Sequence, residues 1–109
     1  MNQWILARVD VFLRHGGKIS RRAMVQRLIK ICEEIQSYET GVKLPPQIGR
    51  AHIHRYWHRQ QRLSPVTLRD HFYALHLLWQ LLGRSGEPPR PPQKVENLPK
   101  KGAGEREED

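Results

Sequence analysis

The sequence predicts an all-α protein, a SAM-like bundle of four helices followed by a C-terminal tail. Apolar residues recur every three or four positions through most of the chain, which is the period of an amphipathic helix. Serine, glycine and proline stand where such helices begin and end. No segment shows the alternation of apolar and polar residues that a half-buried strand requires. At 109 residues the chain is one domain at most.

The first helix is predicted over residues 3–14. His15-Gly16-Gly17 ends it, because glycine readily adopts the left-handed conformation of a helix cap. Four large apolar side chains recur in this segment at helical spacing: Ile5, Val9, Phe12 and Leu13.

The second helix is predicted over residues 21–38, with Ser20 as its N-cap. Basic residues fill its first half and acidic residues its second half, the reverse of the order that the helix dipole favours. A phosphate bound at the N-terminus would explain this order; the alternative is that the charges are simply hydrated. One face is spaced to line the core: Met24, Leu28, Ile31, Ile35 and Tyr38.

The third helix is predicted over residues 46–61, after a loop, with Ile48, Ile53, Tyr56 and Trp57 facing inward. The fourth helix follows Ser64 as N-cap and has Pro65 at its first position, where the missing N–H costs nothing. Gly83 caps its end. Its core seam is the strongest in the chain: Leu68, Phe72, Leu75, Trp79 and Leu82.

The chain changes character after residues 1–84, which are predicted to form the helical domain. Residues 85–109 contain several prolines and no periodic apolar residues, so they are expected to be an extended and then disordered tail. The tail ends in a run of acidic residues. Such a run is typical of a segment that favours solubility; the alternative is that it competes with nucleic acid for the basic domain.

The net charge of +8 is unevenly distributed. The first 83 residues contain thirteen Lys/Arg and five Asp/Glu, whereas the remainder contains six of each. A body this basic attracts polyanions, which favours nucleic acid over other partners. No apolar run approaches the roughly 18–20 residues that span a bilayer, and the N-terminus has no signal-peptide pattern. The single Cys32 excludes an internal disulfide and is expected to be buried. A cytoplasmic protein without a membrane partner is expected.

The order of these motifs resembles the N-terminal core-binding (SAM-like) domain of tyrosine recombinases, the phage-integrase family. The resemblance covers about residues 3–92 and is carried by five segments: Ser20-Arg21-Arg22-Ala23, residues 48–57, Leu63-Ser64-Pro65-Val66-Thr67-Leu68, Ala74-Leu75 and Pro88-Pro89. It implies a domain that clamps double-stranded DNA without cutting it, because the catalytic residues of that family lie in a second domain. An accessory or regulator of DNA integration, DNA recombination or a mobile element is one interpretation; a truncated recombinase is the other.

The expected DNA contacts are mostly with phosphates, which position a protein rather than read sequence. Four to six neutralised phosphates would give a log–log salt slope of about −4 to −5. The candidate residues are the polar N-termini of the second and fourth helices, two cations at the groove edge, a basic stripe on the third helix and a polar face on the fourth: Ser20, Arg21, Arg22, Ser64 and Thr67; Arg27 and Lys30; Arg55, Arg59 and Arg62; Arg69, Tyr73 and His76.

Other functions find less support in the sequence. No nucleophile–base pair or phosphate loop stands out, so neither an enzyme nor a cofactor or small-molecule substrate is expected. The pair His54 and His58 has zinc-ligand spacing but lacks further ligands, so no metal is expected. RNA binding shares the charge argument but lacks an exposed aromatic platform. The alternative is a regulator that docks on a recombinase or another protein through surplus leucines of the fourth helix: Leu77, Leu78 and Leu81.

Overall fold

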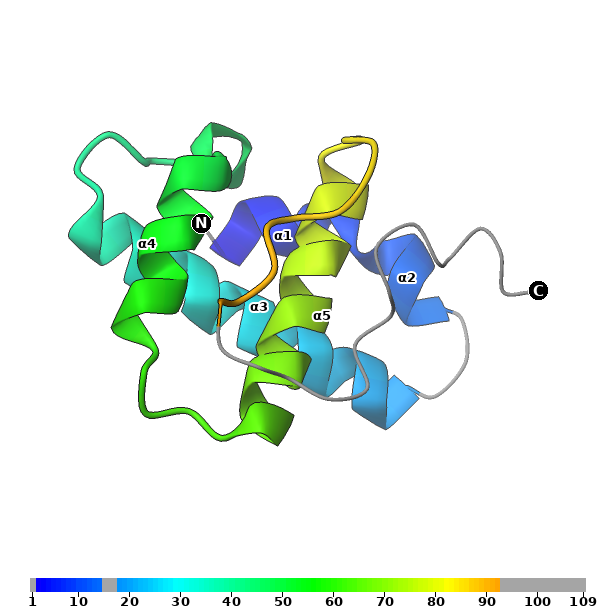
Figure 1. Ribbon diagram of the computed structural model, residues 1–109. Coiled ribbons are helices and arrows are strands. Elements are labelled where there is room, and N and C mark those ends of the chain that lie inside the picture. The colour runs from blue at the N-terminus through cyan, green and yellow to red at the C-terminus, as the bar shows by residue number, and fades with distance from the viewer. Residues whose placement is uncertain (1, 15–17, 93–109) are drawn as a thin grey trace.

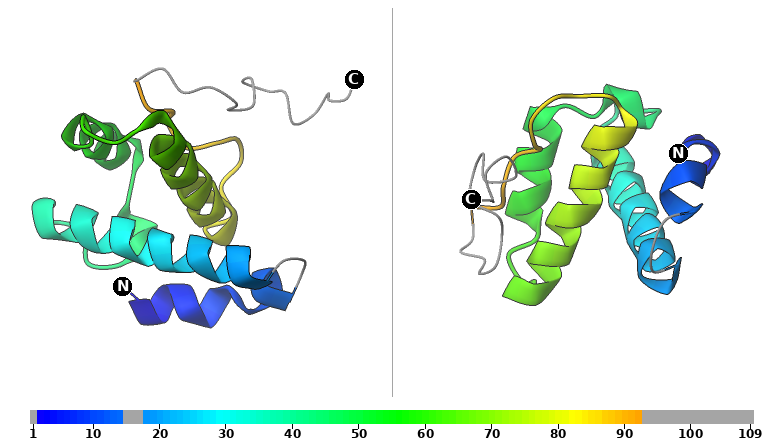
Figure 2. Two further views of the ribbon diagram at one scale, coloured as in Figure 1. Left: turned by 90° about the horizontal axis from the view of Figure 1, so that it is seen from below. Right: turned by 90° about the vertical axis from the view of Figure 1, so that its right-hand side faces the viewer.

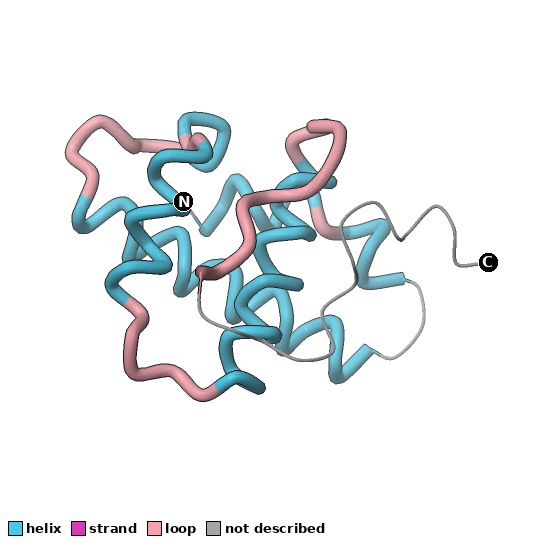
Figure 3. Tube along the Cα trace, in the orientation of Figure 1, coloured by secondary structure: helices cyan, strands magenta, loops and turns pink. Residues whose placement is uncertain are grey.

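The computed structural model describes residues 2–14 and 18–92. Within them the fold is all-α, as predicted, and no residue lies in a strand (Figures 1 and 3). The elements are α1 (Asn2–Arg8), α2 (Asp10–Arg14), α3 (Lys18–Tyr38), a short 3-10 helix η1 (Pro45–Gln47), α4 (Arg50–Arg59) and α5 (Pro65–Leu81).

The long helix α3 is the centre of the arrangement and packs across α5. Helices α1 and α2 lie along one side of α3, and α4 and α5 lie along the other (Figure 2). The predicted inward faces meet in one core. Its largest fully buried side chains come from four helices and from the turn before α4, and they include Ile5, Leu28, Ile35, Ile48, Ile53, Tyr56, Trp57, Leu68, Phe72, Leu75 and Leu78.

Three residues at the ends of the predicted core seams are not fully buried, and the first of them, Met24, is half-buried. Tyr38 is 63 % exposed, because it is the last residue of α3 and lies beyond the packed part of the helix. Its ring lies under the guanidinium of Arg59, 4.1 Å from the ring centroid. Leu82 is half-buried at the end of α5. The assignment of Tyr38 to the core is therefore wrong.

The segment predicted as one helix over residues 3–14 is two helices. The break falls at Val9, which is 1 % exposed, so the change of direction coincides with a core contact. Helical hydrogen bonds continue on both sides, from Val9 N to Ile5 O (3.2 Å) and from Leu13 N to Val9 O (2.8 Å). The predicted extent is confirmed and the predicted continuity is wrong. The expected cap at residues 15–17 lies outside the described residues.

The start of α3 differs from its prediction. The helix begins at Lys18, so Ser20 is its third residue and not its N-cap. Lysine and isoleucine have ordinary helix propensities, so nothing at residues 18–20 stops the helix from extending back beyond the serine. The side chain of Ser20 lies outside the described part.

The third predicted helix, residues 46–61, is shorter than expected. The consecutive prolines form η1 instead, because the ring of Pro46 disfavours the α conformation at Pro45. The helix α4 then starts after Gly49, whose N–H donates to His52 Nδ1 at 2.9 Å. This bond satisfies a backbone donor that the first turn leaves free.

Both predicted caps of α5 are confirmed. The Oγ atom of Ser64 accepts from the N–H of Thr67 at 3.2 Å, and Pro65 is the first helical residue. Gly83 has a φ of 70°, and the N–H of Arg84 donates to Trp79 O at 3.0 Å. Together with the bond from Gly83 N to Gln80 O, these features form a Schellman motif.

Residues 85–92 are part of the folded body, although the sequence assigned them to a tail. They run extended over α4 and α5 (Figure 1), and Pro88, Pro89 and Pro91 are buried. The indole N–H of the buried Trp57 donates to Pro89 O at 2.9 Å. The packed body therefore continues past the boundary predicted after residue 84 and includes residues 85–92. The tail predicted over residues 93–109 lies outside the described residues.

The thiol of Cys32 is fully buried, as predicted. Burial raises its pKa to about 12, so it stays protonated at neutral pH and is not a reactive nucleophile. No helix in residues 2–14 and 18–92 combines the length and apolar character needed to cross a membrane.

Candidate functional site

The three leucines of α5 that the sequence offers for docking are buried or half-buried. Leu77 is 3 % exposed and Leu78 is 0 % exposed, and Leu81 is half-buried against the core. Helix α5 packs across α3, and Arg90 of the 85–92 segment lies over Phe72, 5.5 Å from the ring centroid. The surplus apolar surface expected from the sequence is therefore covered within the chain itself.

The predicted basic stripe on α4 is largely neutralised by carboxylates of α3 and the residue that follows it. Arg55 donates two hydrogen bonds to Glu39, at 2.7 and 3.0 Å. Arg59 lies 3.3 Å from a carboxylate oxygen of Glu34 and 3.9 Å from one of Glu39. The hydrogen bonds from Arg55 lower the pKa of Glu39 below its usual range, so the pair stays ionised. Arg62 is exposed just after α4.

This network explains the charge order of α3, which runs against the helix dipole. Glu34, in its C-terminal half, and Glu39, just after it, have their partners on α4 rather than in the dipole of their own helix. Two of the arginines expected to face DNA thus hold α3 and α4 together.

The remaining candidates on α5 are partly engaged inside the fold. Ser64 Oγ donates to Thr67 Oγ1 at 3.0 Å, so both hydroxyls take part in the cap. Arg69 lies 3.9 Å from Asp70. Two half-buried rings pack near Phe72 with centroid distances of 5.8 and 6.2 Å; they belong to Tyr73 and His76.

The cations of α3 have a different setting. Arg22 and Lys30 are exposed and Arg27 is half-buried. Among the described residues none of these three side chains has a carboxylate partner. Arg21 is half-buried beside them. Arg22, Arg27 and Lys30 are therefore the strongest concentration of cations without a carboxylate partner among the described candidate groups.

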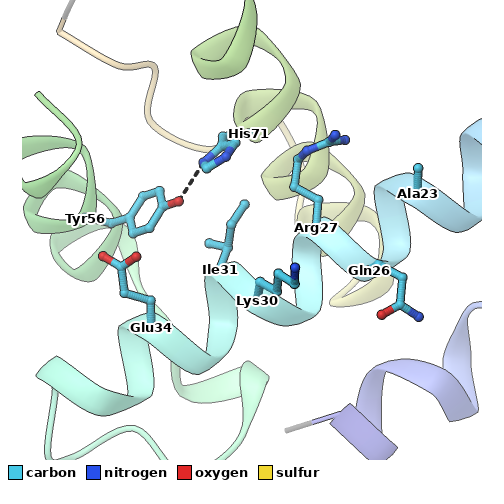
Figure 4. A pocket seen from close by; sticks show the side chains of 8 residues that line it. All are labelled: Ala23, Gln26, Arg27, Lys30, Ile31, Glu34, Tyr56 and His71. Carbon is cyan, nitrogen blue, oxygen red and sulfur yellow. Dashed lines mark hydrogen bonds between the residues drawn. The ribbon is translucent and has the colours of Figure 1, made fainter. Parts of the chain in front are cut away.

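Two of these cations line a cleft with a volume of about 380 Å³. Ala23, Arg27, Lys30 and Glu34 of α3 form one wall, and Tyr56 of α4 and His71 of α5 lie opposite (Figure 4). The cleft thus lies where the three largest helices come together. Its shape and charge suit a ligand that carries an anionic group.

A partly buried hydrogen bond forms part of the opposite wall. The hydroxyl oxygen of Tyr56 lies 2.6 Å from Nδ1 of His71 (Figure 4). Burial raises the pKa of Tyr56 well above its usual range. Burial first, and then the charge of Arg27, lower the pKa of His71. At neutral pH the pair is therefore uncharged, and the hydrogen bond joins a neutral phenol to a neutral imidazole.

Sequence reasoning did not single out this pair. His71 follows Leu68 by three positions and precedes Leu75 by four, so helical spacing places it at the edge of the core seam. A histidine at such a position is a signal for a buried polar contact. The identity of its partner could come only from the tertiary structure.

The lowered pKa of His71 predicts a loss of stability in mild acid. The unfolded chain binds this proton with the ordinary pKa of about 6.5, and the folded chain binds it only at lower pH. The stabilisation is complete above the unfolded pKa and is lost as pH falls through the folded one. We expect the free energy of unfolding, measured by urea titration, to decrease from pH 7 to pH 5 and His71→Gln to flatten this decrease. If His71→Gln shows the same pH dependence as the unmodified chain, His71 is not the group responsible. The control is His54→Gln, at an exposed position, which should keep the original pH dependence.

Among the described residues, no histidine of α4 lies in a group placed to hold a metal ion. His54 and His58 are exposed, and the described residues include no group of three or more His, Cys, Asp or Glu side chains placed to hold an ion.

No protein-family model, no curated protein and no solved structure matches this chain.

Proposed function

We propose that this protein is a non-catalytic DNA-binding module that holds double-stranded DNA by its phosphates through residues 22–30 of α3. The observation that carries the proposal is the cluster of Arg22, Arg27 and Lys30, which lacks a carboxylate partner among the described residues. Like charges gathered on one helix repel one another, and an anionic partner relieves that repulsion.

The overall charge supports the same partner. Residues 2–14 and 18–92 contain fifteen Lys/Arg and six Asp/Glu. Two of those acids, Glu34 and Glu39, are already paired with Arg55 and Arg59, so the α4 arginines contribute to folding more than to binding. Arg62 and the N-terminus of α5 extend the proposed contact surface. About four neutralised phosphates correspond to a log–log salt slope of about −4.

The resemblance to the core-binding domain of tyrosine recombinases suggests the process in which such DNA binding would take part. A cytoplasmic accessory or regulator of DNA recombination or of a mobile element is the role that fits a clamp of this kind. Contacts made mainly with phosphates predict binding with little sequence preference.

The test is a fluorescence-anisotropy titration of the full chain with random duplex DNA from 50 to 250 mM salt. We expect micromolar binding at 50 mM salt and a steep negative salt slope. Arg27→Gln/Lys30→Gln should reduce the magnitude of the slope by about 2, since about one unit is lost per phosphate-binding cation.

The matched control is Arg14→Gln/Lys43→Gln, which removes the same charge from exposed sites on α2 and in the loop after α3. This control should leave the salt slope close to that of the unmodified chain. No binding at 50 mM salt, or equal losses in the two double variants, would refute the proposal.

A further inference from the structure

The cleft between α3, α4 and α5 carries positive charge at one end and negative charge at the other. Attraction to a phosphate backbone involves only the positive end. Arg27 and Lys30 lie toward the N-terminal end of α3, and Glu34 lies toward the C-terminal end (Figure 4). Arg27 and Glu34 are seven residues apart, which is about 10 Å along a helix. One ligand can therefore meet cations at one end and a carboxylate at the other.

The carboxylate end suits a neutral donor rather than a second cation. Glu34 already accepts from Gln60 at 2.7 Å and from Arg59 at 3.3 Å, so its charge is compensated within the chain. A carboxylate has about four lone-pair sites, which leaves capacity for an N–H or O–H group of a ligand.

The opposite wall adds the half-buried ring of His71, which is backed by the buried ring of Tyr56. Tyr56 and His71 lie with their rings near parallel, at an interplanar angle of 23° and a centroid distance of 6.0 Å. The cleft is also lined by the small side chain of Ala23 and by Ile31. A matching ligand has an anionic group for Arg27 and Lys30, a flat ring to lie near His71, and an N–H or O–H donor on that ring for Glu34.

We propose that this cleft receives one nucleotide of a DNA strand that has left its base pair. Its phosphate lies between Arg27 and Lys30, and its base points toward His71 and Glu34. The inference rests on the proposed DNA binding and makes it more specific. Glutamate accepts from the amino group of cytosine, so an unpaired cytosine is the best probe. A paired base must first be unstacked at a cost of a few kcal/mol, which an unpaired base largely avoids.

The experiment compares a short duplex that is fully paired with the same duplex carrying one extra unpaired cytosine. Both are titrated with the full chain by fluorescence anisotropy. We expect the bulged duplex to bind about tenfold more tightly or better, because part of the unstacking energy is saved.

A substitution that fills the cleft without changing charge isolates its role. Ala23 is exposed on the cleft wall, and Ala23→Leu keeps a good helix former at that position. This variant should remove the preference for the bulged duplex while the affinity for paired DNA stays the same. Ala51→Leu, at an exposed position of α4 outside the cleft lining, is the control and should keep the preference.

The outcomes separate this inference from the proposal on which it rests. Equal affinity of the unmodified chain for both duplexes overturns the cleft assignment and leaves DNA binding in place. A preference that survives Ala23→Leu also overturns it, and failure to bind either duplex overturns both proposals. If free cytidine 5′-monophosphate binds as tightly as the bulged duplex, the ligand is a free nucleotide and the inference is wrong.

Discussion

Replacing Trp57 by alanine is expected to lower the free energy of unfolding by about 3–5 kcal/mol, the range for removal of a buried aromatic side chain. Trp57 is 0 % exposed and packs against Tyr56 at a centroid distance of 5.5 Å. Small domains are stable by only about 5–15 kcal/mol. Trp57→Ala should therefore be marginally folded, which urea titration followed by circular dichroism will show.

Trp57→Phe separates the hydrogen bond from the bulk of the ring. It keeps most of the apolar surface but removes the donor to Pro89 O, whose bond is 2.9 Å long and buried. An unsatisfied buried acceptor costs about 1–3 kcal/mol, so an intermediate loss is expected. If Trp57→Phe is as stable as the unmodified chain, this bond does not hold residues 85–92 in place. Trp4→Ala, at a partly buried position, should have a smaller effect than Trp57→Ala.

Replacing Arg84 by methionine is expected to lower the free energy of unfolding by about 2–3 kcal/mol. Hydrogen bonds to charged groups contribute about 1.5–3 kcal/mol. The Arg84 guanidinium donates to Ile48 O at 2.7 Å and to Pro46 O at 3.1 Å. It also lies 4.7 Å from the ring centroid of Trp79. These contacts tie the end of α5 to the turn that precedes α4.

The same measurement with two further variants tests that explanation. The free energy of unfolding of Arg84→Lys should lie between those of the unmodified chain and Arg84→Met, because one ammonium group lacks the planar fork that reaches both carbonyls. Arg62→Met removes an equal charge at an exposed site and should change stability by about 0.5 kcal/mol or less. Equal stabilities of Arg84→Met and Arg62→Met would show that Arg84 is only a surface cation.

The parts of the fold that follow from local rules were predictable from the sequence. The limits of α5 are set by Ser64, Pro65 and Gly83, whose effects act within one helical turn. The inward residues of α4 follow from helical spacing alone. The start of α3 was not predictable in this way, because a serine that can cap a helix can also lie inside its first turn.

The candidate site was less predictable because it depends on which faces meet. Arg55 and its partner Glu39 are sixteen residues apart, and Arg59 and Glu34 are twenty-five apart. Periodicity shows that each side chain lies on a polar face, but it does not show that the two faces meet and cancel. The packing of residues 85–92 has the same origin, since the partner of Pro89 lies thirty-two residues earlier.

The bond between Trp57 and Pro89 also bears on the order in which the protein can fold during its synthesis. A nascent chain that ends at Leu82 already contains the five α-helices of the described residues. The indole N–H of Trp57 still has no Pro89 carbonyl to bond, and Phe72 lacks its covering Arg90. Domains generally fold as units as they emerge from the ribosome. This body can therefore complete its core only after residues 85–92 have been released.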